Sequence, residues 1–329
     1  MLIEHEKYNS SNPFKPFIFI GEKLKTPFPL PKIISPNFIL KVANSLQIEA
    51  IKKIVQPDKL LARHSQAGNP TNIYEYEFVK SKSEHGYTYS AIPLGSVGFE
   101  YWIIELSEYL ADPILVESIY LMTKNLTVIA EIGTIVQHIN HYLISAVYYS
   151  DPYILFREPT DLNESDIEEL HQLYLLINKF KSSDFEKTFI GKALMDYRDT
   201  LDIENSSPFK IIALFSIIET LLTSNQKNNE NSINRQLQKK IMLINNQLDN
   251  KINFFEYFKG PHLLAEETII EKLYYYRSKI AHGDYYDFEN DLQILLDHKA
   301  TFTFLTLLLK RILVFSMRNP RLIIDLKEC

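Results

Sequence analysis

Prolines are concentrated at the start of this chain, where six of the fifteen lie within the first 36 residues. Proline fixes its own φ and donates no backbone hydrogen bond, so this segment should be extended around one short strand, Phe17–Ile20. Two later segments, Asn72–Val79 and Tyr87–Leu94, also predict strands, and Tyr74–Phe78 alternates aromatic and acidic residues as a half-buried strand does. The first part of the chain is therefore not purely helical.

Two other segments in the first part predict helices. In Asn37–Val55 apolar residues recur at every fourth position, which places them on one helix face. Pro113–Tyr148 is mostly apolar and also favours helix, although its β-branched residues leave a strand open as an alternative. Between the first helix and the predicted strands, Arg63–Pro70 has the composition of a loop.

Proline-containing sequences near residue 155, Asp151–Pro152 and Arg157–Thr160, indicate a boundary between two domains. We therefore predict an α+β chain, with a mixed domain over residues 1–155 and an all-helical bundle over residues 156–329. The helices expected in the second domain are 167–180, 184–200, 208–224, 232–248, 263–281 and 288–317.

Composition excludes several classes of protein. The only cysteine is Cys329, so an intramolecular disulfide framework and a cysteine zinc site are excluded, and a cytoplasmic location fits best. The first residues lack the pattern of a signal peptide, and the apolar stretch Thr303–Phe315 is interrupted by Lys310 and Arg311, which favours a core helix over a membrane span. The formal net charge is −6, so any contact with RNA needs a local basic cluster.

The segment Tyr274–Gly283 contains the residues best suited to chemistry. Arg277 occupies a position on a helix face that otherwise carries isoleucine and leucine, and its planar, permanently charged group can hold a phosphate. Five residues later His282 can move a proton near neutral pH. Together they suit phosphodiester cleavage. The alternative is an ordinary helix end, where Arg277 and Lys279 complement the negative end of the helix and Gly283 supplies the left-handed cap.

Two further features bear on this pair. Glu219 is the only charged residue in the apolar segment Ile211–Leu222, and a buried carboxylate needs a partner, for which Arg277 is the obvious candidate. Five residues correspond to a rotation of about 140° on an ideal helix, so Arg277 and His282 should not share one face. Either the helix ends before His282, or two copies of the chain bring the residues together across a two-fold axis.

The sequence Tyr276–Gly283, with an arginine followed by four residues and a histidine, resembles the Apea-like branch of the HEPN superfamily. Lys210–Leu222 is similar to the apolar helix of that branch that carries one acid, and Ile233–Ile241 is similar to its next, basic helix. The resemblance covers about residues 160 to 317. Many HEPN nucleases have Asn, Asp or His directly after the arginine, and here that residue is Ser278.

The resemblance implies a metal-independent endoribonuclease in which an RNA 2′-hydroxyl attacks the adjacent phosphorus. Arg277 and His282 would be the catalytic residues. Ser278 and Lys279 are candidate supporting residues, and we expect Glu219 to orient Arg277, in support of catalysis or merely of the fold. The resemblance also implies a homodimer with a composite active site, a toxin or anti-phage defence effector, and a first domain that senses a phage or host trigger or recognises the substrate. The alternatives are a non-catalytic HEPN-like dimer that binds RNA or a protein partner, and an activity carried by the first domain.

Aromatic and basic residues near the motif are candidate RNA contacts, because unpaired bases stack on aromatic rings and phosphates attract cations. For the aromatic residues the alternative is core and dimer packing, and for the basic ones a solvated helix face. The candidates are Tyr274, Tyr276, Tyr285, Arg235, Lys239 and Lys240.

His138 and His141 stand three residues apart and could bind a metal together with Glu131. No complete set of ligands is evident, so a polar helix face is the preferred interpretation. We expect neither a metal nor a cofactor.

Overall fold

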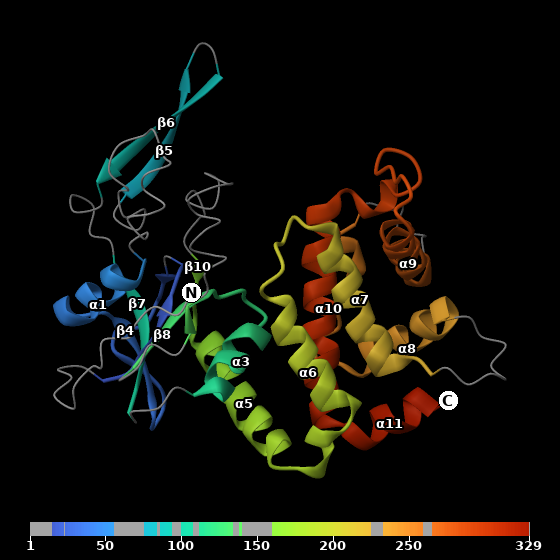
Figure 1. The fold of residues 1–329 in the computed structure, drawn as a ribbon, viewed down its shortest axis with the longest axis horizontal. Coiled ribbons are helices and arrows are strands. Elements are labelled where there is room, and N and C mark those ends of the chain that lie inside the picture. Colours follow the sequence, from blue (N-terminus) through green and yellow to red (C-terminus); the bar gives the residue numbers. More distant parts are fainter. Residues whose placement is uncertain are drawn as a thin grey trace. The chain divides into compact units, whose positions relative to one another are not determined.

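The computed structural model describes residues 15–22, 24–55, 76–83, 86–93, 100–107, 112–133, 138–139, 160–224, 233–258 and 265–328. It confirms an α+β chain whose C-terminal half is helical (Figure 1). The chain divides into two compact units, Met1–Gln172 and Leu173–Cys329. The division lies inside helix α5 (Glu164–Lys181). The predicted domain boundary near residue 155 lies before that helix and stays a prediction.

The first unit contains an antiparallel sheet with the strand order β3-β4-β7-β1-β8-β9. Its central strand β1 (Phe17–Ile20) is buried at all four residues, as a strand covered on both faces must be. The predicted strand at these residues is therefore confirmed. The other strands are β3 (Lys32–Ser35), β4 (Phe38–Val42), β7 (Trp102–Leu106), β8 (Val128–Ile132) and β9 (His138–Ile139).

The described part of the first unit also contains two smaller strand pairs. Strands β5 (Tyr76–Ser83) and β6 (Gly86–Pro93) form an antiparallel hairpin, which confirms the two predicted strands wherever they overlap the described residues. Strands β2 (Leu24–Lys25) and β10 (Thr160–Asp161) pair in parallel. The predicted loop Arg63–Pro70 lies outside the described residues.

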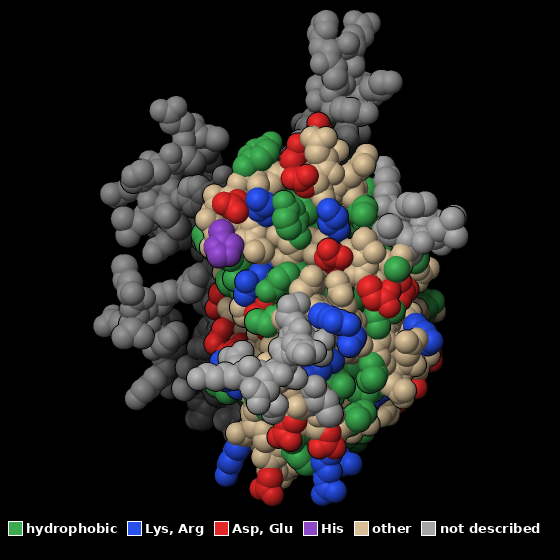
Figure 2. Space-filling view, turned by 90° about the vertical axis from the view of Figure 1, so that its right-hand side faces the viewer, with side chains coloured by type: hydrophobic (Ala, Val, Ile, Leu, Met, Phe, Trp, Pro, Cys, Tyr) green, Lys and Arg blue, Asp and Glu red, His purple; other side chains and the backbone are tan. Residues whose placement is uncertain are grey.

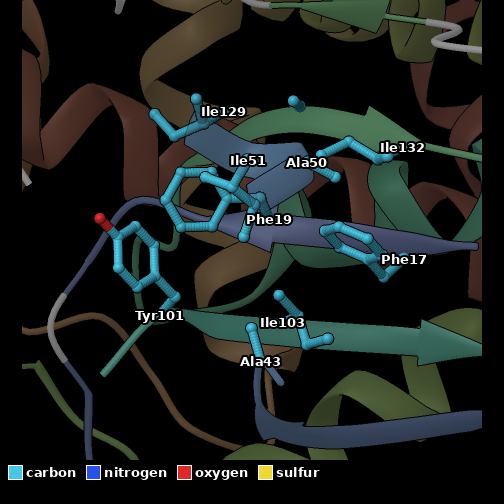
Figure 3. Close-up of a cluster of buried hydrophobic side chains, with 10 residues drawn as sticks. Phe17, Phe19, Ala43, Ala50, Ile51, Tyr101, Ile103, Ile129 and Ile132 are labelled. Atoms are coloured by element: carbon cyan, nitrogen blue, oxygen red, sulfur yellow. The ribbon is translucent and has the colours of Figure 1, made fainter. Parts of the chain in front are cut away.

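Helix α1 (Ser45–Val55) covers one face of the sheet. Ile51 of this helix packs with Phe17 and Phe19 of β1 and Ile103 of β7 in a buried apolar cluster (Figure 3). The predicted helix Asn37–Val55 is therefore wrong over its first part, which forms strand β4.

The start of α1 is set by a reciprocal pair of hydrogen bonds. The backbone N–H of Gln47 donates to the Asn44 side chain, and the backbone N–H of Asn44 donates to the Gln47 side chain, each at 3.0 Å. The Gln47 amide also donates to Glu105 of β7 at 3.0 Å, and Lys41 of β4 forms an ion pair with the same carboxylate. These bonds tie the helix start to the sheet.

Within the described residues, the predicted helix Pro113–Tyr148 is also correct only at its start. Helix α3 (Pro113–Leu121) begins at Asp112, whose side chain accepts the backbone N–H groups of Ile114 and Leu115. The chain then enters strand β8, where β-branched residues dominate, and β9 follows. The strand alternative holds for this part of the segment, and residues 134–137 and 140–148 lie outside the described part.

The second unit is helical, and the sequence predicted most of its helices within a few residues. They are α6 (Phe189–Thr200), α7 (Pro208–Leu222), α8 (Ile233–Gln247), α9 (Glu266–His282), α10 (His298–Arg318) and α11 (Pro320–Glu328). Short 3₁₀ turns lie at Asp184–Lys187, Phe254–Glu256 and Gln293–Leu295.

The predicted helix 288–317 begins ten residues later than expected. Leu296 has a positive φ of 64°, and the next residue, Asp297, caps α10 by accepting the backbone N–H of Ala300 at 2.7 Å. Helix α10 is long and apolar enough to cross a membrane, but 61% of its most apolar 18-residue stretch is buried inside the structure. It packs against α6, α7 and α11 as a core helix. Helix α11 was not predicted.

Candidate functional site

Helix α9 carries the Arg277–His282 motif and packs against α7 and α8 (Figure 1). It stays helical through His282 and ends at Gly283, whose φ of 71° lies in the left-handed region. The N–H of Gly283 donates to the Ile280 carbonyl at 3.2 Å, and the N–H of Asp284 donates to the Lys279 carbonyl at 2.9 Å. The predicted glycine cap is therefore present.

The predicted contact between Glu219 and Arg277 is formed. An Nη of Arg277 donates to Glu219 on α7 at 3.1 Å, and the two side chains are 22% and 18% exposed. Burial raises the pKa of the Glu219 carboxyl, and the charge and hydrogen bond of Arg277 oppose that rise. The pair is half-buried, so both residues keep some access to solvent.

The ion pair uses only part of its hydrogen-bonding capacity. Within the described part of the chain, Arg277 Nε and the second carboxylate oxygen of Glu219 are buried without a hydrogen-bond partner. A carboxylate and a guanidinium can form two parallel bonds, and here one is present. The Tyr274 ring lies 5.8 Å from the guanidinium carbon and contacts Phe215 of α7 edge-on. Arg277 is therefore held from two sides.

His282 is exposed at the end of α9, and Arg277 points from a different side of the same helix. Because α9 is helical through His282, the alternative in which the helix ends earlier is wrong. On one regular helix the two residues are separated by about 140° of rotation and about 7.5 Å of rise. A single chain does not bring the two side chains onto one face.

The predicted RNA contact at Tyr276 is wrong. Its side chain is fully buried, its hydroxyl lies 3.0 Å from Nδ1 of His298, and its ring packs edge-on against Tyr286 and Phe288. Burial raises the pKa of the Tyr276 hydroxyl. A ring enclosed in this way is not available to stack on a base, so Tyr276 is a core residue.

The predicted RNA contact at Lys240 is also wrong, because Lys240 is buried and donates from Nζ to the Lys327 carbonyl at 3.4 Å. Its neighbours on α8, Arg235 and Lys239, are exposed. Tyr285 is 84% exposed, just beyond the end of α9. In Figure 2 acidic and basic side chains are interspersed on the face that is shown, without one large area of a single sign.

A basic and aromatic stripe on the outer side of α9 was not predicted from the sequence. Tyr275 lies between two lysines, with Lys272 Nζ 5.6 Å and Lys279 Nζ 5.4 Å from its ring centroid. Together with His282 these residues follow the i, i+3, i+7, i+10 spacing of one helix face. The apolar stripe containing Arg277 has the same spacing, so the periodicity that identified one stripe could have identified the other.

His138 does not lie on a helix, as the interpretation of His138 and His141 as a polar helix face required. His138 is in strand β9 and pairs with Glu131 of β8, so it is not on a helix face, and His141 lies outside the described residues. Among the residues that the structure describes, no group of three or more His, Cys, Asp and Glu is placed to hold a metal ion.

Comparisons with known proteins return no match, either against protein-family models, against curated proteins or against solved structures.

Proposed function

We propose that the chain is a metal-independent endoribonuclease of HEPN type that acts in the cytoplasm as a toxin or an anti-phage effector. The observation that carries this proposal is the half-buried Arg277, which α7 holds through Glu219 at 3.1 Å, five residues before an exposed His282. An oriented arginine whose side chain keeps some access to solvent suits a phosphate, and an exposed histidine suits proton transfer. The resemblance of Tyr276–Gly283 to the HEPN motif supports the same chemistry.

In the proposed reaction, His282 takes the proton of an RNA 2′-hydroxyl as its oxygen attacks the adjacent phosphorus. The bond from phosphorus to the 5′-oxygen breaks, and that oxygen takes a proton from a solvent water as it leaves. Arg277 stabilises the charge that develops on the phosphate oxygens, an electrostatic contribution that is often the largest in catalysis. The products are a 2′,3′-cyclic phosphate and a 5′-hydroxyl.

The separation of about 140° between Arg277 and His282 on α9 favours a site built by two copies of the chain. A two-fold interface places the same motif on both sides, so the arginine of one copy can face the histidine of the other. Glu219 acts as a positioning residue in this arrangement, because it touches Arg277 and not the RNA.

The test is cleavage of several classes of RNA in EDTA by the wild type, by Arg277→Ala and by His282→Ala. We expect wild-type cleavage that leaves 2′,3′-cyclic phosphate ends, a loss of roughly 100-fold or more in each variant, and no cleavage of DNA. Intact RNA in all three samples, including after exposure to phage infection extracts, would overturn the nuclease.

One observation favours a second candidate, a dimer that binds RNA or a protein without cutting. The positive charge of Arg277 is already offset by Glu219, which weakens its attraction for a phosphate. In that case the wild type would bind RNA or a protein partner, and neither the wild type nor His282→Ala would cut RNA.

A further inference from the structure

The outer stripe of α9, Lys272, Tyr275, Lys279 and His282, is accessible along its whole length. His282 is exposed and the other three side chains are partly exposed, whereas Leu273 and Tyr276 on the inner side of the helix are buried. The two lysines are separated by about 10 Å of helix rise, with the tyrosine between them. We call these four residues the basic stripe.

The contacts within the basic stripe leave its charged ends adaptable. Both ammonium groups lie near the Tyr275 ring, and each is carried on a flexible four-carbon stem. Two acids lie close to the stripe. Asp284 is 3.4 Å from Lys279 Nζ, and the exposed Glu271 occupies an adjacent position on the helix. An ion pair of this length at the surface contributes little, so a phosphate can compete for Lys279.

We infer that the basic stripe binds single-stranded RNA and leads it to His282. Tyr275 stacks on one unpaired base, and Lys272 and Lys279 contact phosphates on either side of it. The role given to His282 rests on the proposed nuclease activity. The binding of RNA by the stripe does not.

The residue types favour single-stranded RNA over other partners. A ring stacks on a base only when that base is unpaired, and two cations that flank a ring suit a backbone that runs past it. An acidic protein segment would satisfy the lysines but would leave Tyr275 without a role. A duplex would contact the lysines and could not stack on the ring.

The position of the basic stripe also indicates which copy of the chain supplies each catalytic residue. Around the axis of α9, His282 lies about 20° from Tyr275 and about 140° from Arg277. A strand on the basic stripe of one copy therefore reaches the histidine of that copy, and a second copy supplies the arginine.

The test is binding of the full-length protein to fluorescein-labelled 2′-O-methyl RNA of about 12 nucleotides, as each homopolymer, measured by anisotropy at several salt concentrations. This RNA lacks the attacking hydroxyl and stays intact. We expect Lys272→Gln and Lys279→Gln each to lower the slope of log affinity against log salt by about 0.7. Tyr275→Ala should weaken binding about 5- to 150-fold with the slope unchanged, and Tyr275→Phe should bind as the wild type.

Two more variants sharpen the result. Asp284→Asn removes the acid beside Lys279 and should tighten binding. Lys192→Gln is the matched control, because Lys192 is also a surface lysine paired with an aspartate, at 2.6 Å from Asp196 on α6, and its loss should change nothing. Circular dichroism verifies that each variant is folded.

Three outcomes overturn the inference that the basic stripe binds RNA. They are no binding of any homopolymer, equal affinity of the wild type and the stripe variants, and an affinity that the lysine changes lower while Tyr275→Ala leaves it unchanged. The last of these would indicate an acidic partner or unspecific charge attraction. Binding that depends on the stripe, with no cleavage of ordinary RNA, keeps the inference and overturns the nuclease. Cleavage with an unchanged KM in the stripe variants keeps the nuclease and overturns the inference.

Discussion

Among single residues, Glu219 is notable because two opposing influences act on the pKa of its carboxyl. Burial raises the pKa of its carboxyl, and Arg277 at 3.1 Å limits that rise. A raised pKa means that the folded protein binds the proton more tightly than the unfolded chain does. The stability that this proton contributes is full below the unfolded pKa and is lost as the pH rises through the folded pKa.

Glu219→Gln should therefore remove part of the decline in stability as the pH rises through and above the ordinary carboxyl range. Glutamine has nearly the same shape and no proton to lose. The measurement is the urea midpoint of wild type and variant at several pH values, taken as a difference so that other carboxyl groups cancel. The exposed Glu271→Gln on α9 is the control. A constant difference at all pH values would show that the Glu219 carboxyl does not titrate as proposed.

At the scale of elements, the end of α9 depends on Gly283. Its φ of 71° is costly for any residue with a Cβ, although a Cβ at this position would meet nothing within 4 Å. Gly283→Ala should therefore destabilise the fold by about 1–2 kcal/mol through backbone conformation alone. Gly283→Asn should cost less, because asparagine tolerates the left-handed region. Urea unfolding of the three proteins tests this order, and equal stability of all three would contradict it.

Gly191→Ala provides a contrast for the same measurement. A Cβ on Gly191 of α6 would lie 1.8 Å from the Glu186 carbonyl oxygen, so the helix or the preceding turn would have to move. A steric clash with backbone should destabilise more than the conformational cost at Gly283 does.

Helices with a clear end signal could be predicted from sequence, and segments with an ambiguous period could not. The helices of the second unit have a long 3.6-residue period, and α9 also has its glycine cap. In Asn37–Val55, the spacing between Phe38 and Val42 fits both one helix face and one strand face, because four is a multiple of two. Asn44 and Gln47, three residues apart, were the signal that the helix begins later.

The candidate site could also be predicted from the sequence only in part. The pairing of Glu219 with Arg277 could be predicted, since one acid and one arginine stood out on apolar faces. The burial of Tyr276 agrees with the alternative of core packing, since Tyr276 follows Ile269 and Leu273 at i, i+4, i+7 spacing. Its partners Tyr286, Phe288 and His298 could not be predicted, because they lie beyond the end of the helix. Local periodicity carries no information about such contacts.

At the scale of the whole molecule, the question is whether one chain or two build the proposed active site. A site that takes its arginine from one copy and its histidine from another can be rebuilt from two inactive variants. Arg277→Ala and His282→Ala, unfolded together in equal amounts and refolded, should form mixed dimers in about half of the population. Each mixed dimer keeps one of its two arginine–histidine pairs, so RNA cleavage should recover to about a quarter of the wild-type rate.

The same two variants refolded separately and then mixed briefly are the control, because their subunits have had no chance to exchange. A site within one chain predicts no recovery in either sample, since no chain then carries both residues. Recovery only after refolding together would place the arginine and the histidine on different copies, as expected from a helix that separates them by about 140°.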